Sequence, residues 1–130
     1  MPSATKAPSK KTPAPAYLNP ALPAARRTKD LLSRMTLEEK AAQMMCVWRE
    51  KADTLVDADG KFDLAKAKKA FKDRRGLGQV GRPSEAGKGL RARATAELSN
   101  AIQKFFVENS RLGIPVIFHE ECIAVIVSCI

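Results

Sequence analysis

Residues 110–121 read Ser-Arg-Leu-Gly-Ile-Pro-Val-Ile-Phe-His-Glu-Glu, and this stretch decides the fold class of the chain. A glycine and a proline near its start end the preceding helix, and the apolar residues 116–118 then predict a short buried strand. Glu120 and Glu121 follow at the C-terminal end of that strand. Carboxylates at the C-terminal ends of parallel strands are where α/β barrels place their chemistry. The stretch therefore favours an α/β fold with a candidate site at this strand end.

A long amphipathic helix is predicted directly before this strand, over residues 90–110. Leu98, Ile102, Phe105 and Phe106 recur there at intervals of three and four, so they share one helical face. Such a face is typical of a helix that packs on a sheet.

The remaining elements are predicted from caps and composition. Thr36 and Glu39 form a capping box, in which each side chain bonds a backbone amide exposed at the start of a helix. Asp63 is placed to cap another helix. The expected elements are an extended clip at 17–20, helices at 24–34, 36–44 and 64–74, a strand at 44–48, a turn into a short strand at 76–80, and a polar loop at 51–60. Helices followed by strands are typical of one end of an α/β protein.

Length and charge limit the possible functions. The chain has 130 residues, whereas a complete (β/α)₈ barrel takes roughly 250. Its net charge of +9 raises the alternative of a non-catalytic basic module that binds nucleic acid or another acidic partner. The basic residues are spread along the chain and only 5% of the residues are aromatic, which favours solvated helix faces and no specific nucleic-acid site.

The N-terminal residues 1–16 are rich in Ala, Pro and Lys, and we predict that they are disordered. They lack the apolar core of a secretory signal, which favours a cytoplasmic location. No stretch approaches the ~20 apolar residues of a membrane span, so no membrane contact is expected. Cys46, Cys122 and Cys129 are interpreted as small buried apolar residues, and no metal or cofactor is expected.

Two motifs resemble ligand sites, but each lacks a required part. Residues 76–81 match the G-x-G-x-x-G dinucleotide pattern, yet a basic helix precedes them and Arg82-Pro83-Ser84 follows them, where the motif requires a helix. Residues 57–60, Asp-Ala-Asp-Gly, resemble a calcium loop, but two further ligand positions hold Leu55 and Lys66. We interpret the first as a glycine-rich turn and the second as a loop tip.

The two adjacent carboxylates are the strongest chemical signal. Neighbouring residues on a strand point to opposite faces, so only one of Glu120 and Glu121 can face a barrel mouth. The other is expected to turn toward a neighbouring loop or helix. Ligand binding and a solvated strand end both remain open from the residues alone. His119, the only histidine, could orient a substrate hydroxyl or simply complete the strand end.

Three blocks of the sequence together resemble glycoside hydrolase family 3, which includes β-glucosidases and β-xylosidases. They are Leu-Leu-Ser-Arg-Met-Thr-Leu-Glu-Glu-Lys-Ala-Ala-Gln-Met at 31–44, Gly-Gln-Val-Gly-Arg-Pro-Ser at 78–84, and 100–121, which ends in the stretch quoted above. The resemblance covers about residues 17–122. It implies the opening portion of a (β/α)₈ TIM-like barrel, helix-rich and incomplete, acting on β-glucosides or β-xylosides.

The resemblance also implies roles for particular residues. By position, Glu121 matches the acidic residue that binds hydroxyls of the non-reducing sugar in this family. The family pattern then continues with Leu-His-Gly, whereas this chain has Ile123-Ala124-Val125. The family's nucleophile lies in a Ser-Asp-Trp/Tyr motif that does not occur here, and its acid/base lies further on. We therefore assign substrate binding to Glu121 and no catalytic residue.

The resemblance divides the chain into three parts. Residues 1–16 form the tail, residues 17–122 a partial family 3 N-terminal domain, and residues 123–130 a divergent apolar segment. A frameshift, a gene fragment and a short paralogue each fit that last segment. By itself the chain is expected to be inactive and prone to aggregate or self-associate, because it would expose strand edges and apolar surface.

Overall fold

The computed structural model describes residues 14–120, which are divided into two compact units, with the boundary in the sequence between Met35 and Thr36. The first unit contains a short 3-10 helix, η1 (Ala16–Leu18), and α1 (Ala24–Arg34). The carboxylate of Asp30 accepts hydrogen bonds from the Tyr17 amide and the Arg34 guanidinium, both at 3.0 Å. The predicted helix is confirmed. The predicted extended clip is wrong, because Tyr17 lies in a turn that these bonds tie to α1.

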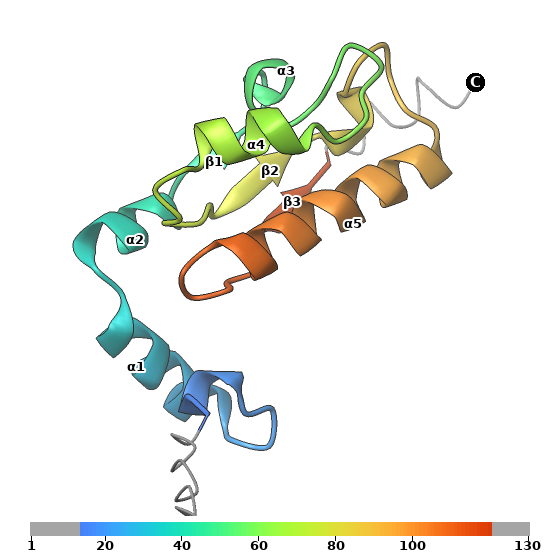
Figure 1. Cartoon of the computed structure of the whole chain (residues 1–130). Coiled ribbons are helices and arrows are strands. Elements are labelled where there is room, and N and C mark those ends of the chain that lie inside the picture. The colour runs from blue at the N-terminus through green and yellow to red at the C-terminus, as the bar shows by residue number, and fades with distance from the viewer. Residues whose placement is uncertain (1–13, 121–130) are drawn as a thin grey trace, which may run out of the picture. The chain divides into compact units, whose positions relative to one another are not determined.

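The second unit, from Thr36 on, carries the sheet. Its elements in chain order are α2 (Leu37–Ala42), β1 (Cys46–Val47), α3 (Lys51–Thr54), α4 (Leu64–Ala70), β2 (Gln79–Gly81), the 3-10 helix η2 (Pro83–Glu85), α5 (Ala92–Asn109) and β3 (Ile117–His119). The strands are parallel in the order β1-β2-β3, and Val47, Val80 and Phe118 lie side by side in register. Parallel neighbours need a crossover, and here helices supply it. The prediction of an α/β fold is confirmed (Figure 1).

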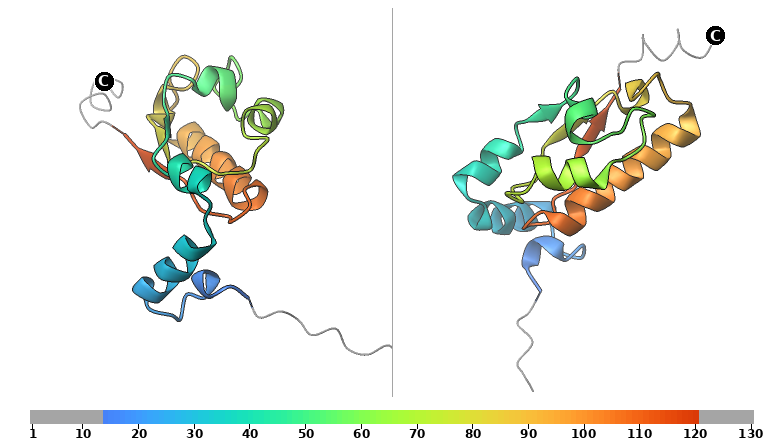
Figure 2. Two further views of the ribbon diagram at one scale, coloured as in Figure 1. Left: turned by 90° about the vertical axis from the view of Figure 1, so that its left-hand side faces the viewer. Right: turned by 45° about the horizontal axis from the view of Figure 1, so that its top comes forward.

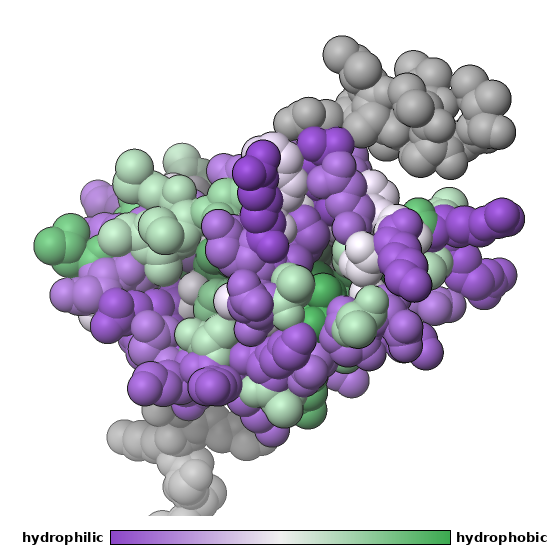
Figure 3. All heavy atoms as spheres, turned by 90° about the horizontal axis from the view of Figure 1, so that it is seen from above, coloured by the Kyte–Doolittle hydropathy of each residue, from purple (hydrophilic) through white to green (hydrophobic). Residues whose placement is uncertain are grey.

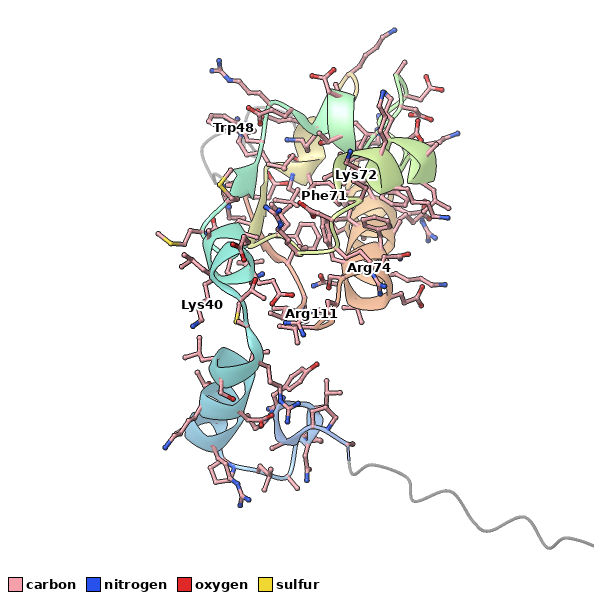
Figure 4. All side chains as sticks on the ribbon, turned by 60° about the vertical axis from the view of Figure 1, so that its left-hand side comes forward. Lys40, Trp48, Phe71, Lys72, Arg74 and Arg111 are labelled. Carbon is pink, nitrogen blue, oxygen red and sulfur yellow. The ribbon has the colours of Figure 1, made fainter. Side chains whose placement is uncertain are left out.

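The core of this unit lies between the sheet and helices α4 and α5, which cover the same face of it (Figures 1 and 2). All four apolar residues that define the predicted face of α5 are buried. Phe71 points between the two helices, where its ring lies 4.8 Å from that of Phe106 and 6.4 Å from that of Phe105 (Figure 4). Aromatic packing thereby joins the end of α4 to α5.

Both predicted caps are present. The Thr36 hydroxyl accepts from the Glu39 amide at 3.2 Å, and the Glu39 carboxylate accepts from the Thr36 amide at 2.9 Å. The Asp63 carboxylate accepts from two amides of the first turn of α4. Each helix ends earlier than predicted, α2 at Ala42 and α4 at Ala70.

The prediction of a polar loop over residues 51–60 is wrong in its first half. Lys51–Thr54 form α3, and Leu55 and Val56 are fully buried against α4 and α5. In the sequence, charged residues lie close to Leu55 and Val56 on both sides, so no apolar pattern indicates that these two residues are buried. Only the tip, from Asp57 on, is a turn. Within residues 14–120, no helix is long and apolar enough to cross a membrane.

Candidate functional site

Side chains from all three strands gather at the C-terminal edge of the sheet. Trp48 follows β1, Arg82 follows β2, and His119 and Glu120 end and follow β3. Because the strands are parallel, their C-terminal ends meet at one edge, where α/β folds place ligand sites. We call Trp48, Lys51, Arg82, Ser84, Glu85 and Glu120 the strand-end cluster. Figure 4 labels Trp48 at its β1 side.

Lys51, at the start of α3, is the buried centre of this cluster, with only 5% of its surface exposed. Its ammonium donates to the carbonyl oxygens of Trp48 at 2.6 Å and of Gly81 at 2.7 Å. Burial lowers the pKa of Lys51, and the negative charges of Glu85 and Glu120 oppose that shift. The lysine thus joins the ends of β1 and β2 from within the protein.

Arg82 connects β2 to the other parts of the cluster. Its backbone is left-handed, with φ of 49°, a conformation that non-glycine residues adopt at a cost. Its amide donates to the His119 carbonyl oxygen at 2.7 Å, while its guanidinium pairs with Glu85 and lies 5.4 Å from the Trp48 ring centre. The Trp48 indole also donates to Glu85, at 3.2 Å. Together these contacts orient the tryptophan ring at the strand ends.

Glu120 is turned toward η2, the 3-10 helix that follows β2. Its two carboxylate oxygens accept from the Ser84 amide at 2.8 Å and from the Ser84 hydroxyl at 3.0 Å. This is the direction that strand alternation allows for one of the two adjacent carboxylates. The other, Glu121, lies outside the described residues.

His119 packs closely on Gly81. A Cβ added at Gly81 would lie 2.9 Å from the His119 Nε2 atom, so the missing side chain leaves room for the imidazole. The histidine thus helps to pack the ends of β2 and β3 together.

An open cleft of about 370 Å³ lies beside the cluster. Trp48, Arg49, Lys51, Asp57, Glu85 and Gly87 are among its lining residues. The view from above in Figure 3 shows a mainly hydrophilic face with smaller apolar areas between the polar side chains. Charged groups beside an aromatic ring suit a polar ligand that also has an apolar face.

The glycine motif at 76–81 serves packing. A Cβ at Gly78 would lie 2.0 Å from the Gln43 carbonyl oxygen, so β2 can pass the end of α2 only with glycine there. The next helical element, η2, has three residues and does not begin directly after the motif. The interpretation as a glycine-rich turn is confirmed.

The tip at 57–60 is also explained without an ion. The Asp57 carboxylate accepts from the Asp59 and Lys61 amides at 3.0 and 2.9 Å, which closes the turn. Across residues 14–120, no group of three or more His, Cys, Asp or Glu side chains is arranged to hold a metal.

The sequence indicated Glu120 as a site candidate but not the other five residues of the strand-end cluster, and one cysteine was misplaced. The missed residues are Trp48, Lys51, Arg82, Ser84 and Glu85. The available signal was the position of Trp48 at the end of an expected strand. Cys46 is exposed, so its interpretation as a buried residue is wrong, because it lies on the sheet face that α4 and α5 leave uncovered. Cys122 and Cys129 lie outside the described residues.

Comparison with known proteins identifies the class. No protein-family model matches the chain. It is 35% identical over 106 residues to a "Putative beta-xylosidase" of Formosa agariphila, a match that covers 81% of this chain and 13% of that protein. It is 40% identical over 94 residues to a "Periplasmic beta-glucosidase/beta-xylosidase" of Dickeya chrysanthemi, covering 72% of this chain and 14% of that protein.

The chain is therefore similar, over most of its length, to a short segment of glycoside hydrolases, and the resemblance seen in the sequence is confirmed at this level. The two relatives carry the names of β-xylosidases and β-glucosidases. The chain spans only about one seventh of the length of these curated relatives.

Proposed function

We propose that the chain is the opening portion of a (β/α)₈-type barrel of a family 3 glycoside hydrolase and that it contributes part of the binding site for β-linked glucosides or xylosides. The similarity to two glycosidases over most of the chain carries this proposal. Three parallel strands with helices between them, and a polar cluster at their C-terminal ends, support it.

We assign the substrate contact to Glu121. Alternation along a strand sends adjacent side chains to opposite sides, and Glu120 is already bound to Ser84. An ionised carboxylate forms strong, charge-assisted hydrogen bonds with sugar hydroxyls. Such bonds hold the sugar in both the ground state and the transition state, so the expected role is binding.

We assign no catalytic residue within these 130 residues. Hydrolysis of a glycosidic bond by this class needs two carboxyl groups that face each other across the sugar, about 5–9.5 Å apart. The family's Ser-Asp-Trp/Tyr motif does not occur in the sequence. The chain by itself is therefore expected to bind saccharides and not to hydrolyse them.

Saccharide binding by the purified chain tests this proposal. Xylobiose and cellobiose should shift the backbone NMR resonances of Arg82, Ser84 and Glu120, whereas maltose, which is α-linked, should not. Glu121→Gln should weaken the binding at least tenfold, whereas Glu108→Gln, which changes an exposed carboxylate on α5, should leave it unchanged. Absence of binding, or equal binding by Glu121→Gln, would contradict the proposal.

Hydrolysis is tested in the same preparations with aryl β-xylosides and aryl β-glucosides. Release of the phenol should stay at the level of a blank. Turnover that persists through repurification and is lost in Glu121→Gln would show that the chain is an enzyme by itself.

The alternative of a basic nucleic-acid module rests on net charge alone. In the described residues, several basic side chains already donate hydrogen bonds to protein acceptors, namely Arg27, Arg34, Lys51, Lys66, Arg74 and Arg111. Retention on DNA that falls steeply with salt would favour this alternative over saccharide binding.

A further inference from the structure

We propose that Lys51 is a positioning residue, which sets the placement of the strand ends that carry the saccharide site. The inference rests on the proposed function for the identity of the ligand. The structural part of the inference, namely how the three strand ends are held together, does not depend on the ligand.

The geometry at the ammonium group is the first step. Lys51 donates to the Trp48 carbonyl oxygen, just beyond β1, and to the Gly81 carbonyl oxygen, at the end of β2. The two bonds, 2.6 and 2.7 Å long, are at the short end for N–H···O contacts, as expected when the donor is charged. Beyond the paired residues of β1 and β2, these bonds are a second link between the two strands.

The link continues to β3 through the residues that follow Gly81. The Arg82 amide donates to the His119 carbonyl oxygen, and Ser84 donates twice to the Glu120 carboxylate. A displacement of Gly81 would therefore be passed on to Glu120. Lys51 is the member of this chain of bonds that fixes its position relative to β1.

The burial of Lys51 favours a role in holding the strand ends over a general contribution to stability. Burying an ammonium costs free energy unless it is paired and hydrogen-bonded, and here only 5% of the residue is exposed. Lys66 offers a contrast, since its ammonium also donates to two carbonyl oxygens, those of Ala52 in α3 and Val56 after it, but to neither of the strand ends that Lys51 joins. The two lysines thus make the same kind of bonds at different places.

Amide hydrogen exchange of the full 130-residue chain distinguishes the roles of Lys51 and Lys66. In Lys51→Met, exchange at the Arg82 and Ser84 amides should become at least tenfold faster, while exchange at Ile102 and Phe106 in α5 stays as in the wild type. The control Lys66→Met should leave the Arg82 and Ser84 amides unchanged. Affinity for xylobiose or cellobiose should fall at least tenfold in Lys51→Met and stay unchanged in the control.

The outcomes separate this inference from the proposed function. If the wild type binds neither disaccharide, the proposed function fails, whereas the exchange comparison still decides whether Lys51 positions the strand ends. Unchanged exchange at Arg82 and Ser84 in folded Lys51→Met, or an equal acceleration throughout α5, would overturn the inference. If Lys51→Met does not fold, Lys51→Gln, which is shorter and uncharged but polar, takes its place and should show the same faster exchange at Arg82 and Ser84. Unfolding of both would show that Lys51 supports the whole fold, and would also overturn it.

Discussion

At the scale of single residues, the Glu39 carboxylate joins the start of α2 to the segment after α5. It completes the capping box at Thr36 and also accepts hydrogen bonds from the Nε and Nη2 atoms of Arg111, at 2.6 and 2.5 Å. Glu39 is buried, whereas about half of the Arg111 side chain is exposed. The hydrogen bonds from Arg111 lower the pKa of Glu39, and the Thr36 amide adds to this shift.

This lowered pKa predicts how stability depends on pH. Because the folded pKa lies below the unfolded value near 4.3, the stabilisation is fully present above that pH and is lost as the pH falls through the folded pKa. Glu39→Gln should lower the free energy of unfolding at pH 7 by about 2 kcal/mol, a typical value for hydrogen bonds to a charged group. Urea unfolding at pH 7 and at pH 3 measures this.

The same measurement on Glu108→Gln serves as the control, because that carboxylate is exposed. The difference in the free energy of unfolding between wild type and Glu39→Gln should shrink at pH 3. Glu108→Gln should stay close to wild type at both pH values. A Glu39→Gln difference that is equal at pH 7 and pH 3 would show that the ion pair with Arg111 contributes little.

The capping box and the ion pair of Glu39 differ in how far the sequence indicates them. The capping box is a local pattern of three-residue spacing, so Thr36 and Glu39 predict it directly. The ion pair joins residues 72 positions apart, and nothing in either neighbourhood of the sequence indicates the partner. The same holds for Lys51, whose role depends on a carbonyl group 30 positions away.

At the scale of elements, two glycines decide how closely the sheet approaches its neighbours, Gly78 just before β2 and Gly81 at its end. Gly78→Ala should lower the free energy of unfolding by about 3 kcal/mol, the upper end of the usual range for overpacking, because its Cβ would overlap the rigid backbone of Gln43. Gly81→Ala should cost less, since its Cβ would meet the side chain of His119, which can move. Urea unfolding of both variants measures the difference. Equal losses, or a larger loss for Gly81→Ala, would contradict this account.

Elements whose apolar residues recur at a regular spacing were predictable from the sequence, and elements that depend on tertiary contacts were not. The buried face of α5 follows from apolar spacing over eighteen residues, so its existence and orientation were evident from the sequence. α3 is a single turn with four residues, too short for a period to show. It forms because Leu55 and Val56, just after it, enter the core, which is a property of the fold and not of the local sequence.

At the scale of the whole molecule, the sheet leaves apolar surface and strand edges exposed. In the described residues β1 and β3 each pair on one side only, and Ile117, Met44 and Met45 are 65%, 85% and 60% exposed. Unpaired edges beside apolar side chains favour association. The 130-residue chain should therefore sediment as a mixture that shifts to larger species as its concentration rises.

Ile117→Lys should reduce that shift, because a charge on an edge strand opposes edge-to-edge pairing. Sedimentation velocity at several concentrations compares the two proteins, with Lys40→Ala, on the exposed side of α2, as the control. A wild-type chain that stays monomeric at every concentration would contradict the prediction.

The candidate site could be located from the sequence but not built from it. The carboxylates at the end of residues 116–118 indicated the edge of the sheet at which the strand-end cluster lies, because parallel strands bring their C-terminal ends together. The contacts among Trp48, Lys51, Arg82 and Glu85 depend on the order of the strands and on the left-handed turn at Arg82. Neither feature leaves a pattern in the sequence.

We propose that Glu121 binds substrate at the site of a family 3 glycoside hydrolase, and kinetics of a chimeric enzyme test this proposal most directly. Residues 17–121 replace the matching segment of the Formosa agariphila relative, and kcat/KM is measured with an aryl β-xyloside, with and without azide. The account predicts an active chimera, in which Glu121→Ala lowers kcat/KM by roughly two to four orders of magnitude, on the order of 3–5 kcal/mol, with no rescue by azide. A folded but inactive chimera, an unchanged kcat/KM in Glu121→Ala, or azide rescue with an inverted glycosyl azide product would contradict it.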